Sequence, residues 1–320
     1  MLKKGFCWIL LCALLLAGCG AKETAQPAED GEQPLKIVAT VFPAYDFART
    51  CGGEDVEVTL LLPPGTESHS YEPTPADILA VQECDLFLYL GGESDAWVDT
   101  ILSAAEPTGR TFKLMDCVDL LEEETVEGME SDHDHDHEEE LGQVKEYDEH
   151  VWTSPRNAAQ IVRDIAGTMG ELDPEHAETF RTRGEAYAGQ IEVLDQQFRD
   201  FFDSLPSRTI VFGDRFPLRY FAEEYDLDYY AAFPGCSTQT EPSAATIAFL
   251  TDKVRDEHIS TVWYIEFSNH LVADSIAEAT GTKTAMFHTC HNVSQEEMDS
   301  GATYLSLMEG NLETLRANMP

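Results

Sequence analysis

Short apolar runs alternate with amphipathic stretches from residue 35 onward. Short runs of β-branched or apolar residues are typical of buried strands in a parallel sheet. Four such runs lie in the first half of the chain: Leu35–Val41, Val56–Leu62, Leu86–Leu90 and Thr111–Met115. Helical periodicity is found between them, at Tyr45–Cys51, Pro75–Cys84 and Ala96–Ala104. This alternation predicts an α/β domain.

The second half of the chain repeats the pattern, which predicts a second α/β lobe. Its strands are expected at Thr209–Phe212, Tyr229–Phe233, Thr261–Ile265 and Thr284–Phe287. Its helices are expected at Pro217–Tyr225, Pro242–Glu257, Asn269–Thr280 and Ala302–Ala317.

One long amphipathic helix is predicted between the lobes. Asp173 and Pro174 suit its N-cap and first position, and Pro206 ends it. Apolar side chains recur at helical spacing: Phe180, Tyr187, Ile191, Leu194, Phe198, Phe201 and Leu205. About 30 residues make a rod of roughly 45 Å, so we expect little hinge motion. The predicted boundaries are 35–171 for the N-terminal lobe, 172–206 for the linking helix and 207–320 for the C-terminal lobe.

Residues 1–18 have the form of a signal peptide. A basic start precedes an apolar run from Phe6 to Ala17, which is shorter than the roughly 20 residues of a membrane span. The run ends in Leu-Ala-Gly-Cys19, which resembles the bacterial lipobox. We therefore expect a lipid on Cys19 that holds the protein at the extracytoplasmic face of the cell membrane. Residues 19–34, rich in Ala, Glu, Gln and Pro, predict a flexible tether.

The chain is strongly acidic. It has 60 Asp and Glu against 20 Lys and Arg, a formal net charge of −40. That charge repels phosphate backbones and argues against nucleic-acid binding. It suits a cationic ligand, although it can also serve solubility alone.

Two histidines stand where α/β folds place their ligands. His69 follows a predicted strand in the segment Leu61–Pro75, so it is expected at the carboxyl end of the first sheet. His150 lies in Asp148–Pro155, just ahead of a helix. Neutral imidazole is a good ligand for zinc and also binds manganese or iron. Taken alone, either histidine is more often a surface or capping residue.

Together, these features resemble the cluster A-I metal-binding lipoproteins of bacterial ABC importers. The resemblance covers nearly the whole mature chain: the lipobox, PPG…H-x-Y-E-P-T-P, H-V-W-x-x-P, the long helix, and T-Y-L-x-L-M-x-x-N-L at Thr303 to Leu312. It implies two four-stranded α/β lobes with one metal ion between them. It also implies that His69 and His150 are the two ligands of the N-terminal lobe, and that the partners are an ABC permease and its ATPase.

The C-terminal lobe departs from the pattern of these receptors. Where the resemblance implies a His or Glu ligand after the first strand, this chain has Gly213, and we expect the adjacent Asp214 to take its place. A salt bridge to Arg215 or a helix cap is the other interpretation of Asp214. The Asp expected after the last strand is missing, and His291 is expected to complete the site. The alternatives left open are His288, Cys290 and Glu266.

Five cysteines follow the lipidated Cys19: Cys51, Cys84, Cys117, Cys236 and Cys290. An odd number leaves at least one thiol free if disulfides are intramolecular. Cys236 and Cys290 both follow strands of the second lobe, and we expect a disulfide between them. A Cys290 thiolate bound to zinc is the alternative, since zinc accepts sulfur readily.

An acidic insertion, residues 122–149, precedes His150. Fourteen of its 28 residues are acidic and few are apolar, so we expect it to be mobile. Its histidines alternate with aspartates, and a spacing of two does not preset a tetrahedral site. We therefore expect weak, secondary zinc binding at His133, His135 and His137.

The function expected from the sequence is that of a lipid-anchored, monomeric receptor. It would capture a divalent metal, Zn²⁺ in the first place and Mn²⁺ as the alternative, and deliver it to an ABC permease. No enzyme activity is expected, because the chain has no HExxH, GxSxG or P-loop motif. The rival from another class is a zinc-dependent surface hydrolase, for which Glu72 is the only nearby acid to nominate as general base. A metal-mediated adhesin is a third interpretation.

Overall fold

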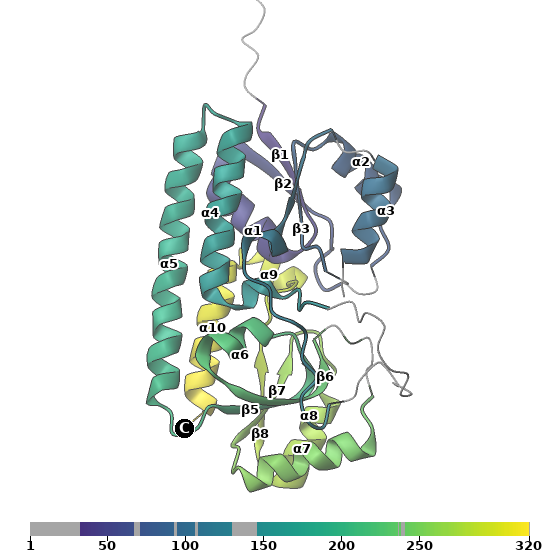
Figure 1. Ribbon diagram of the computed structural model, residues 1–320, viewed down its shortest axis with the longest axis vertical. Helices are drawn as coiled ribbons and strands as arrows, with labels where there is room; N and C mark the ends of the chain where they lie inside the picture. Colours follow the sequence, from purple (N-terminus) through teal and green to yellow (C-terminus); the bar gives the residue numbers. More distant parts are fainter. Residues whose placement is uncertain are drawn as a thin grey trace, which may run out of the picture. The chain divides into compact units, whose positions relative to one another are not determined.

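Each half of the chain forms its own sheet of four parallel strands (Figure 1). The first sheet, ordered β2-β1-β3-β4, contains β1 (Leu35–Ala39), β2 (Val56–Leu60), β3 (Leu86–Tyr89) and β4 (Arg110–Lys113). The second, ordered β6-β5-β7-β8, contains β5 (Thr209–Phe216), β6 (Asp228–Pro234), β7 (Thr261–Ile265) and β8 (Lys283–Phe287). The eight predicted strands and the class of two four-stranded α/β lobes are confirmed.

The computed structural model describes residues 33–66, 71–92, 95–105, 108–129, 146–235, 237 and 241–319. Both lobes belong to one unit of tertiary contacts, Pro34–Pro320. Several predictions fall outside the described residues: the signal peptide, nearly all of the tether, Cys19, His69, Cys236 and the three histidines His133, His135 and His137. No helix in the described part of the chain is both long and apolar enough to cross a membrane.

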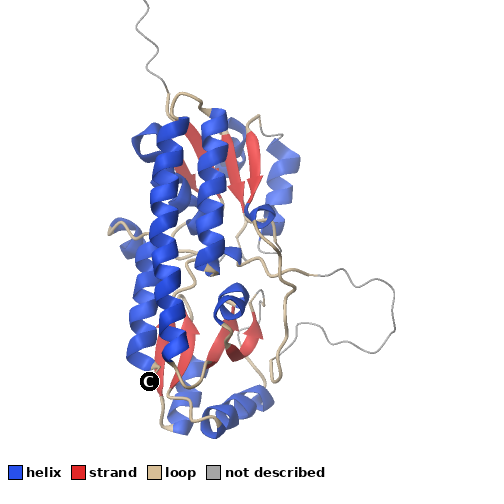
Figure 2. Ribbon diagram, turned by 60° about the vertical axis from the view of Figure 1, so that its left-hand side comes forward, coloured by secondary structure: helices blue, strands red, loops and turns tan. Residues whose placement is uncertain are grey.

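Helices cover both faces of the first sheet (Figure 2). They are α1 (Phe42–Gly52), α2 (Pro75–Glu83), α3 (Ala96–Ala105) and α4 (Pro155–Leu172). Ile37 and Leu88 belong to the cluster that contains the apolar side chains of α1 and α4. Val38 and Phe87 belong instead to the cluster with α2 and α3. Because neighbouring residues of one strand are buried on opposite faces, these strands show no polar alternation.

The second sheet is covered in the same way by α6 (Arg219–Tyr225), α7 (Ala244–Asp256), α8 (Leu271–Thr280) and α10 (Tyr304–Asn318), and the short helix α9 (Gln295–Asp299) lies between β8 and α10 in the chain. Val211 and Val262 pack with α7 and α8, whereas Phe212 and Trp263 lie in the cluster that includes α6 and α10. The short 3-10 helices are Gly53–Asp55, Leu114–Cys117 and Val151–Thr153. The sequence did not predict α9, a single turn held by a capping box at Ser294.

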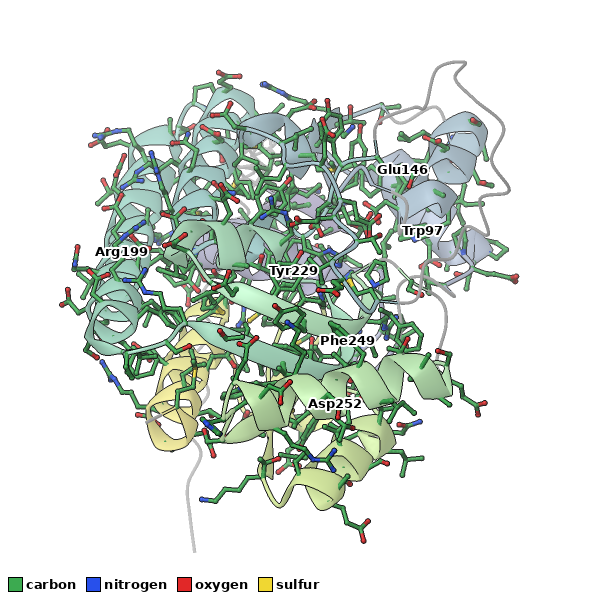
Figure 3. The ribbon with its side chains drawn as sticks, turned by 60° about the horizontal axis from the view of Figure 1, so that its bottom comes forward. Trp97, Glu146, Arg199, Tyr229, Phe249 and Asp252 are labelled. Atoms are coloured by element: carbon green, nitrogen blue, oxygen red, sulfur yellow. The ribbon has the colours of Figure 1, made fainter. Side chains whose placement is uncertain are left out.

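The long linking helix is α5 (Ala177–Ser204), whose 28 residues span about 42 Å at 1.5 Å each. It contacts α1 and α4 in one lobe and α6 and α10 in the other. Arg199 of α5 (Figure 3) forms an ion pair with Glu224 of α6. The expected start at Asp173 is wrong. Asp173 Oδ1 accepts the N–H groups of residues 175 and 176 at 3.2 and 3.3 Å, so a turn precedes the helix.

One hydrophobic cluster continues through both lobes. It includes Ile37 of β1, Phe198 of α5, Phe212 of β5 and Met308 of α10. Two lobes that share a core along one helix cannot rotate far without exposing apolar surface. This agrees with the expected lack of a large hinge.

The ends of the acidic insertion are ordered, contrary to the mobility expected of the whole segment. We call residues 118–129 and 146–149 the stem. Its two arms pair through a bridge between Glu122 and Tyr147. Tyr220 of α6 hydrogen-bonds to both arms. Its hydroxyl donates to the Asp148 carbonyl at 2.8 Å and accepts from the Leu121 N–H at 3.2 Å. The sequence did not show these contacts, because Tyr220 lies far from the insertion along the chain.

The stem also lies on the C-terminal lobe. The Tyr229 hydroxyl (Figure 3) donates to Glu124 Oε2 at 3.2 Å, and Arg219 pairs with the same oxygen at 3.3 Å. A Cβ on Gly128, whose φ is +87°, would lie 2.1 Å from the Phe249 ring. The base of the acidic insertion is therefore attached to the C-terminal lobe.

Candidate metal site between the lobes

A small cavity lies between the lobes at the carboxyl ends of the strands. Its volume is about 30 Å³. His150 and His291 line it from opposite lobes, together with Leu62, Thr66, Arg215, Pro217, Gly235, Ile265, Glu266, Phe267, Thr289 and Asn292. The centroids of the two imidazole rings are 5.6 Å apart. The structure thus brings together two of the predicted ligands.

His150 is fixed by the residues around it. It is 1% exposed and lies just before the 3-10 turn that leads into α4. Its ring Nδ1 lies 3.2 Å from Asp148 Oδ1, and its backbone N–H donates to the same oxygen at 2.8 Å. A carboxylate on Nδ1 favours the tautomer with the proton there, which leaves Nε2 as the nitrogen for a metal ion. This arrangement is common for histidine ligands of metals.

Carboxyl groups close to His150 influence the pKa of its imidazole. Burial lowers the pKa of His150, but the carboxylates of Asp148 and Glu149 outweigh burial and raise it above the usual value. Burial raises the pKa of Asp95 to about 7, and nearby Glu149 adds to this. The backbone N–H of Leu90 donates to Asp95 Oδ2 at 2.5 Å. None of these carboxyl groups was singled out from the sequence, because burial decides their behaviour.

Trp152 connects the two histidines. Its ring centroid lies 5.5 Å from that of His150 and 5.2 Å from that of His291. Its indole N–H donates to the Thr289 carbonyl at 2.8 Å, across the lobes. The Tyr304 hydroxyl of α10 donates to the Trp152 carbonyl at 2.8 Å. Trp152 therefore holds the loop of His291 in place against the loop of His150.

His288 is held by other protein groups. Its Nδ1 accepts the Cys290 N–H at 2.9 Å, and its Nε2 lies 3.5 Å from Glu297 Oε1. It is not among the residues that line the cavity. His291 therefore lines the cavity and His288 does not, and which of the two binds a metal ion stays a prediction.

Cys290 is a free, buried thiol. The expected disulfide between Cys236 and Cys290 is therefore not formed in the structure. Its Sγ lies 3.8 Å from the His288 carbonyl, and its backbone has a φ of +63°. Burial raises the pKa of this thiol, and the His288 ring opposes the shift. Cys236, the partner in the expected pairing, lies outside the described residues.

A bulge in β5 lies between Phe212 and Arg215 and includes Asp214. The register against β6 shifts between Phe212 and Arg215. Asp214 Oδ1 accepts the Arg215 N–H at 2.8 Å, and its Oδ2 accepts the Ile265 N–H at 3.3 Å. Arg215 lines the cavity, and Asp214 is absent from the lining residues. A β-bulge changes the direction in which a side chain points, and no sequence pattern predicted this one. Asp214 stays a prediction as a ligand.

Glu266, the alternative ligand, does line the cavity. Its Oε2 accepts the Thr289 N–H at 2.7 Å, and its Oε1 accepts the Thr289 hydroxyl at 2.5 Å. These bonds tie the end of β7 to the loop that carries His291. Glu266 therefore has a structural role whether or not it binds a metal ion.

The segment that leads to His69 reaches the same cavity. Asn292 donates through Nδ2 to the carbonyls of Pro63 and Thr66, at 2.8 and 2.9 Å. Gly65 N–H donates to the Val293 carbonyl at 2.8 Å. Thr66 lines the cavity and lies three positions before His69. Among the described residues no group of three His, Cys, Asp or Glu is arranged to hold a metal ion.

Comparison with known proteins identifies relatives of this chain. The family model described as zinc-uptake complex component A, periplasmic, matches residues 37–318. The high-affinity zinc uptake system protein ZnuA of Bacillus subtilis is 30% identical, over 100% of this chain and 99% of that protein. The zinc-binding lipoprotein AdcA of Streptococcus pneumoniae is 32% identical over 96% of this chain, which spans 59% of that longer protein. The crystal structure of the Zn(II)-bound ZnuA-like domain of the pneumococcal AdcA superposes with a TM-score of 0.73 at 28% identity, covering 90% of this chain and 99% of the domain.

Proposed function

The chain belongs to the family of zinc-uptake complex component A, periplasmic, and we propose that it is the receptor that captures Zn²⁺ outside the cytoplasm for an ABC importer. His150 and His291 bind the ion from the two lobes, and His69 supplies a third imidazole. The fourth coordination position of the ion is taken by Asp214, the predicted ligand, or by Glu266. Glu266 is better supported, because it lines the cavity.

The pairing of His150 with His291 is the observation that carries this proposal. Imidazoles that bind one tetrahedral zinc ion through Zn–N bonds of about 2.0–2.1 Å have ring centroids about 5 Å apart. The two rings here are 5.6 Å apart, on opposite walls of one cavity. Nitrogen donors favour zinc over manganese, which prefers oxygen. Zinc is therefore the proposed cargo, with Mn²⁺ as the weaker candidate.

The small cavity gives no support to a hydrolase. Its volume of about 30 Å³ is enough for an ion and one small ligand. The family to which the chain belongs is named for zinc uptake, which is binding and transport. We therefore propose no catalytic residues, and no role of Glu72 as a general base.

The partners follow from the same function. We propose that an ABC permease accepts the ion and that its ATPase drives transport. A lipid on Cys19 would hold the monomeric receptor at the extracytoplasmic face of the membrane, because two acyl chains anchor a soluble body without spanning the bilayer. Palmitate labelling of wild-type and Cys19→Ala protein tests the anchor.

Calorimetry of zinc binding to His150→Ala tests the core site. We expect loss of high-affinity binding with the fold intact, because His150 lies in a loop outside the sheets. His69→Ala should behave alike. His270→Ala is the matched control, since His270 is 48% exposed at the side chain and pairs with Asp274 at 2.8 Å. Unchanged affinity in His150→Ala would overturn the assignment.

The histidines of the acidic insertion are proposed as a weak secondary site. Ordering a polar segment costs about 1–2 kcal/mol per residue, with no apolar burial to offset it. Deletion of Ser131–Glu140 should keep one tight zinc site and remove only weaker equivalents. Loss of the tight site on deletion would show that these histidines are primary ligands.

A further inference from the structure

Exposed apolar side chains gather on one side of the C-terminal lobe. In the part of the chain that the structure describes, the large apolar side chains that are well exposed are Leu79, Tyr147, Val193, Phe267, Leu271 and Met286. The last three lie in the turn from β7 into α8, at the start of α8 and on β8, and they are 48, 65 and 39% exposed. We call Phe267, Leu271 and Met286, with Tyr264 and His270, the apolar patch.

Contacts between α8 and the outer strands of the second sheet make the patch continuous (Figure 1). Tyr264 of β7 and Met286 of β8 are register partners, so their side chains leave the sheet on the same face. The His270 ring lies on Tyr264, with ring centroids 5.1 Å apart. Asp274 of α8 accepts the Thr284 hydroxyl at 3.3 Å, which ties the first turn of this helix to β8. The start of α8 therefore lies against this edge of the sheet.

Phe267 joins the patch to the cavity between the lobes. It lines the cavity, although nearly half of its surface is exposed, so it lies at the rim. Its backbone φ is +60°, a conformation that is unfavourable for a bulky residue. His270, three residues further on, has a φ of +47°. Backbone strain beside an exposed aromatic ring is typical of a functional surface.

We propose that the apolar patch is the surface on which the permease of the importer docks when it takes the ion. The proposal rests on the zinc-receptor function above. An acceptor has to approach the receptor where the ion leaves, and the patch begins at the rim of the cavity with Phe267. None of its members carries a formal charge, in a chain with a net charge of −40. The matching surface of the permease therefore presents apolar side chains.

The patch fits a second copy of this chain less well. At about 200 Å² for a large side chain, its three most exposed members present about 300 Å². A stable complex buries about 800 Å² per partner, so the patch suits a brief contact, as a receptor that docks and leaves requires. Two copies with a formal net charge of −40 each also repel one another.

Zinc uptake by the bacterium that encodes this chain tests the proposal. The gene is replaced by the double variant Leu271→Ser and Met286→Ser, and uptake of radioactive zinc is measured in zinc-limited medium. The initial rate should fall about tenfold or more, because exposed apolar anchors carry much of the energy of a small interface. Calorimetry should show unchanged zinc affinity, since neither residue lines the cavity. Val193→Ser is the matched control and should leave uptake unchanged, because Val193 is 60% exposed on α5, on the other face of the sheet from α8.

Photo-crosslinking identifies the occupant of the patch. Benzoylphenylalanine in place of Leu271 should join the receptor to the permease, identified by mass spectrometry, and the same amino acid in place of Val193 should not. A crosslink between two copies of the chain would assign the patch to a dimer and overturn the proposal. Because this probe replaces one exposed side chain, poor folding of the double variant cannot leave the question open.

The outcomes separate the docking surface from the function on which it rests. Uptake at the wild-type rate in the double variant shows that the patch is not used, and the zinc receptor stands. If uptake falls together with zinc affinity or with the amount of receptor on the cells, the patch acts on the site or the fold, which also overturns the proposal. If folded wild-type protein binds no zinc, the proposed function itself fails.

Discussion

Replacement of Trp152 by Phe should weaken the fold and the metal site together. The indole N–H is lost, so the buried Thr289 carbonyl that accepts it at 2.8 Å loses its partner. An unsatisfied buried group costs about 1–3 kcal/mol. The smaller ring also leaves a void, which adds about 1 kcal/mol, well below the roughly 3–5 kcal/mol of a Trp→Ala truncation. For a chain of this size a loss of about 2–4 kcal/mol lowers Tm by about 5–10 °C.

The effect on zinc follows from the contacts of the same ring. Trp152 packs at 5.5 Å on His150 and at 5.2 Å on His291, so a smaller ring lets both imidazoles reorient. Removing groups that orient metal ligands costs about 10–100-fold in affinity, and we expect a loss in that range. Thermal melting of the zinc-free protein and calorimetry measure the two effects.

The matched control is Trp263→Phe. Trp263 is 2% exposed in β7, and its indole N–H has no partner among the described residues. This variant should lose stability from the smaller ring alone and keep its zinc affinity. If Trp152→Phe melts like Trp263→Phe and binds zinc like wild type, the link between the indole and the two histidines is refuted.

Three further results are expected. First, zinc affinity should fall with decreasing pH from above pH 6.5, because the raised pKa of His150 makes protons compete earlier. The stability of the zinc-free protein should change in the opposite sense. The stabilisation from protonated His150 is complete below about pH 6.5 and is lost as pH rises through the folded-state pKa of this residue. Across pH 5–9, zinc affinity from calorimetry should therefore rise with pH, and Tm of the zinc-free protein should fall. Second, His291→Ala should lose tight zinc binding and His288→Ala should keep it, and the reverse result in calorimetry would exchange their roles. Third, Tyr220→Phe should lower the free energy of unfolding by about 1–2 kcal/mol, because two hydrogen bonds are lost. It should also speed amide hydrogen exchange in the stem, and unchanged exchange at residues 118–129 would show that Tyr220 does not hold the two arms together.

The inner strands β1 and β3 could be predicted because both of their faces are buried. Residues such as Val38 and Ile37 contact different helices, and this is visible in the sequence as an unbroken apolar run. Helix α9 has no such signal, since a single turn presents no apolar stripe. The start of α5 was misplaced because Asp173 and Pro174 suit either a helix cap or the turn before it.

The candidate site could be predicted only in part, for a related reason. His150 and His291 were expected as ligands from the resemblance to metal-binding lipoproteins, and their ring centroids lie 5.6 Å apart in the structure. Asp214 was expected because it is adjacent to Gly213, where that resemblance implies a ligand. The bulge in β5 could not be predicted, and Arg215 rather than Asp214 lines the cavity. Trp152 and Asp148 were missed because their roles come from contacts across the fold, with Thr289 and with the His150 ring.

The same contacts bear on how an ion would enter and leave the proposed site. The shared core along α5 opposes a large rotation of the two lobes. In the part of the chain that the structure describes, three hydrogen bonds join the segment 63–66 to the loop of His291: two from Asn292 and one to the Val293 carbonyl. Each contributes about 0.5–1.5 kcal/mol net, so breaking these bonds costs far less than opening the core. We therefore expect the ion to exchange by local opening of these two loops, one from each lobe, while α5 keeps the lobes in place; faster hydrogen exchange at residues 63–66 and 291–293 than in α5 would be the observation that agrees with this.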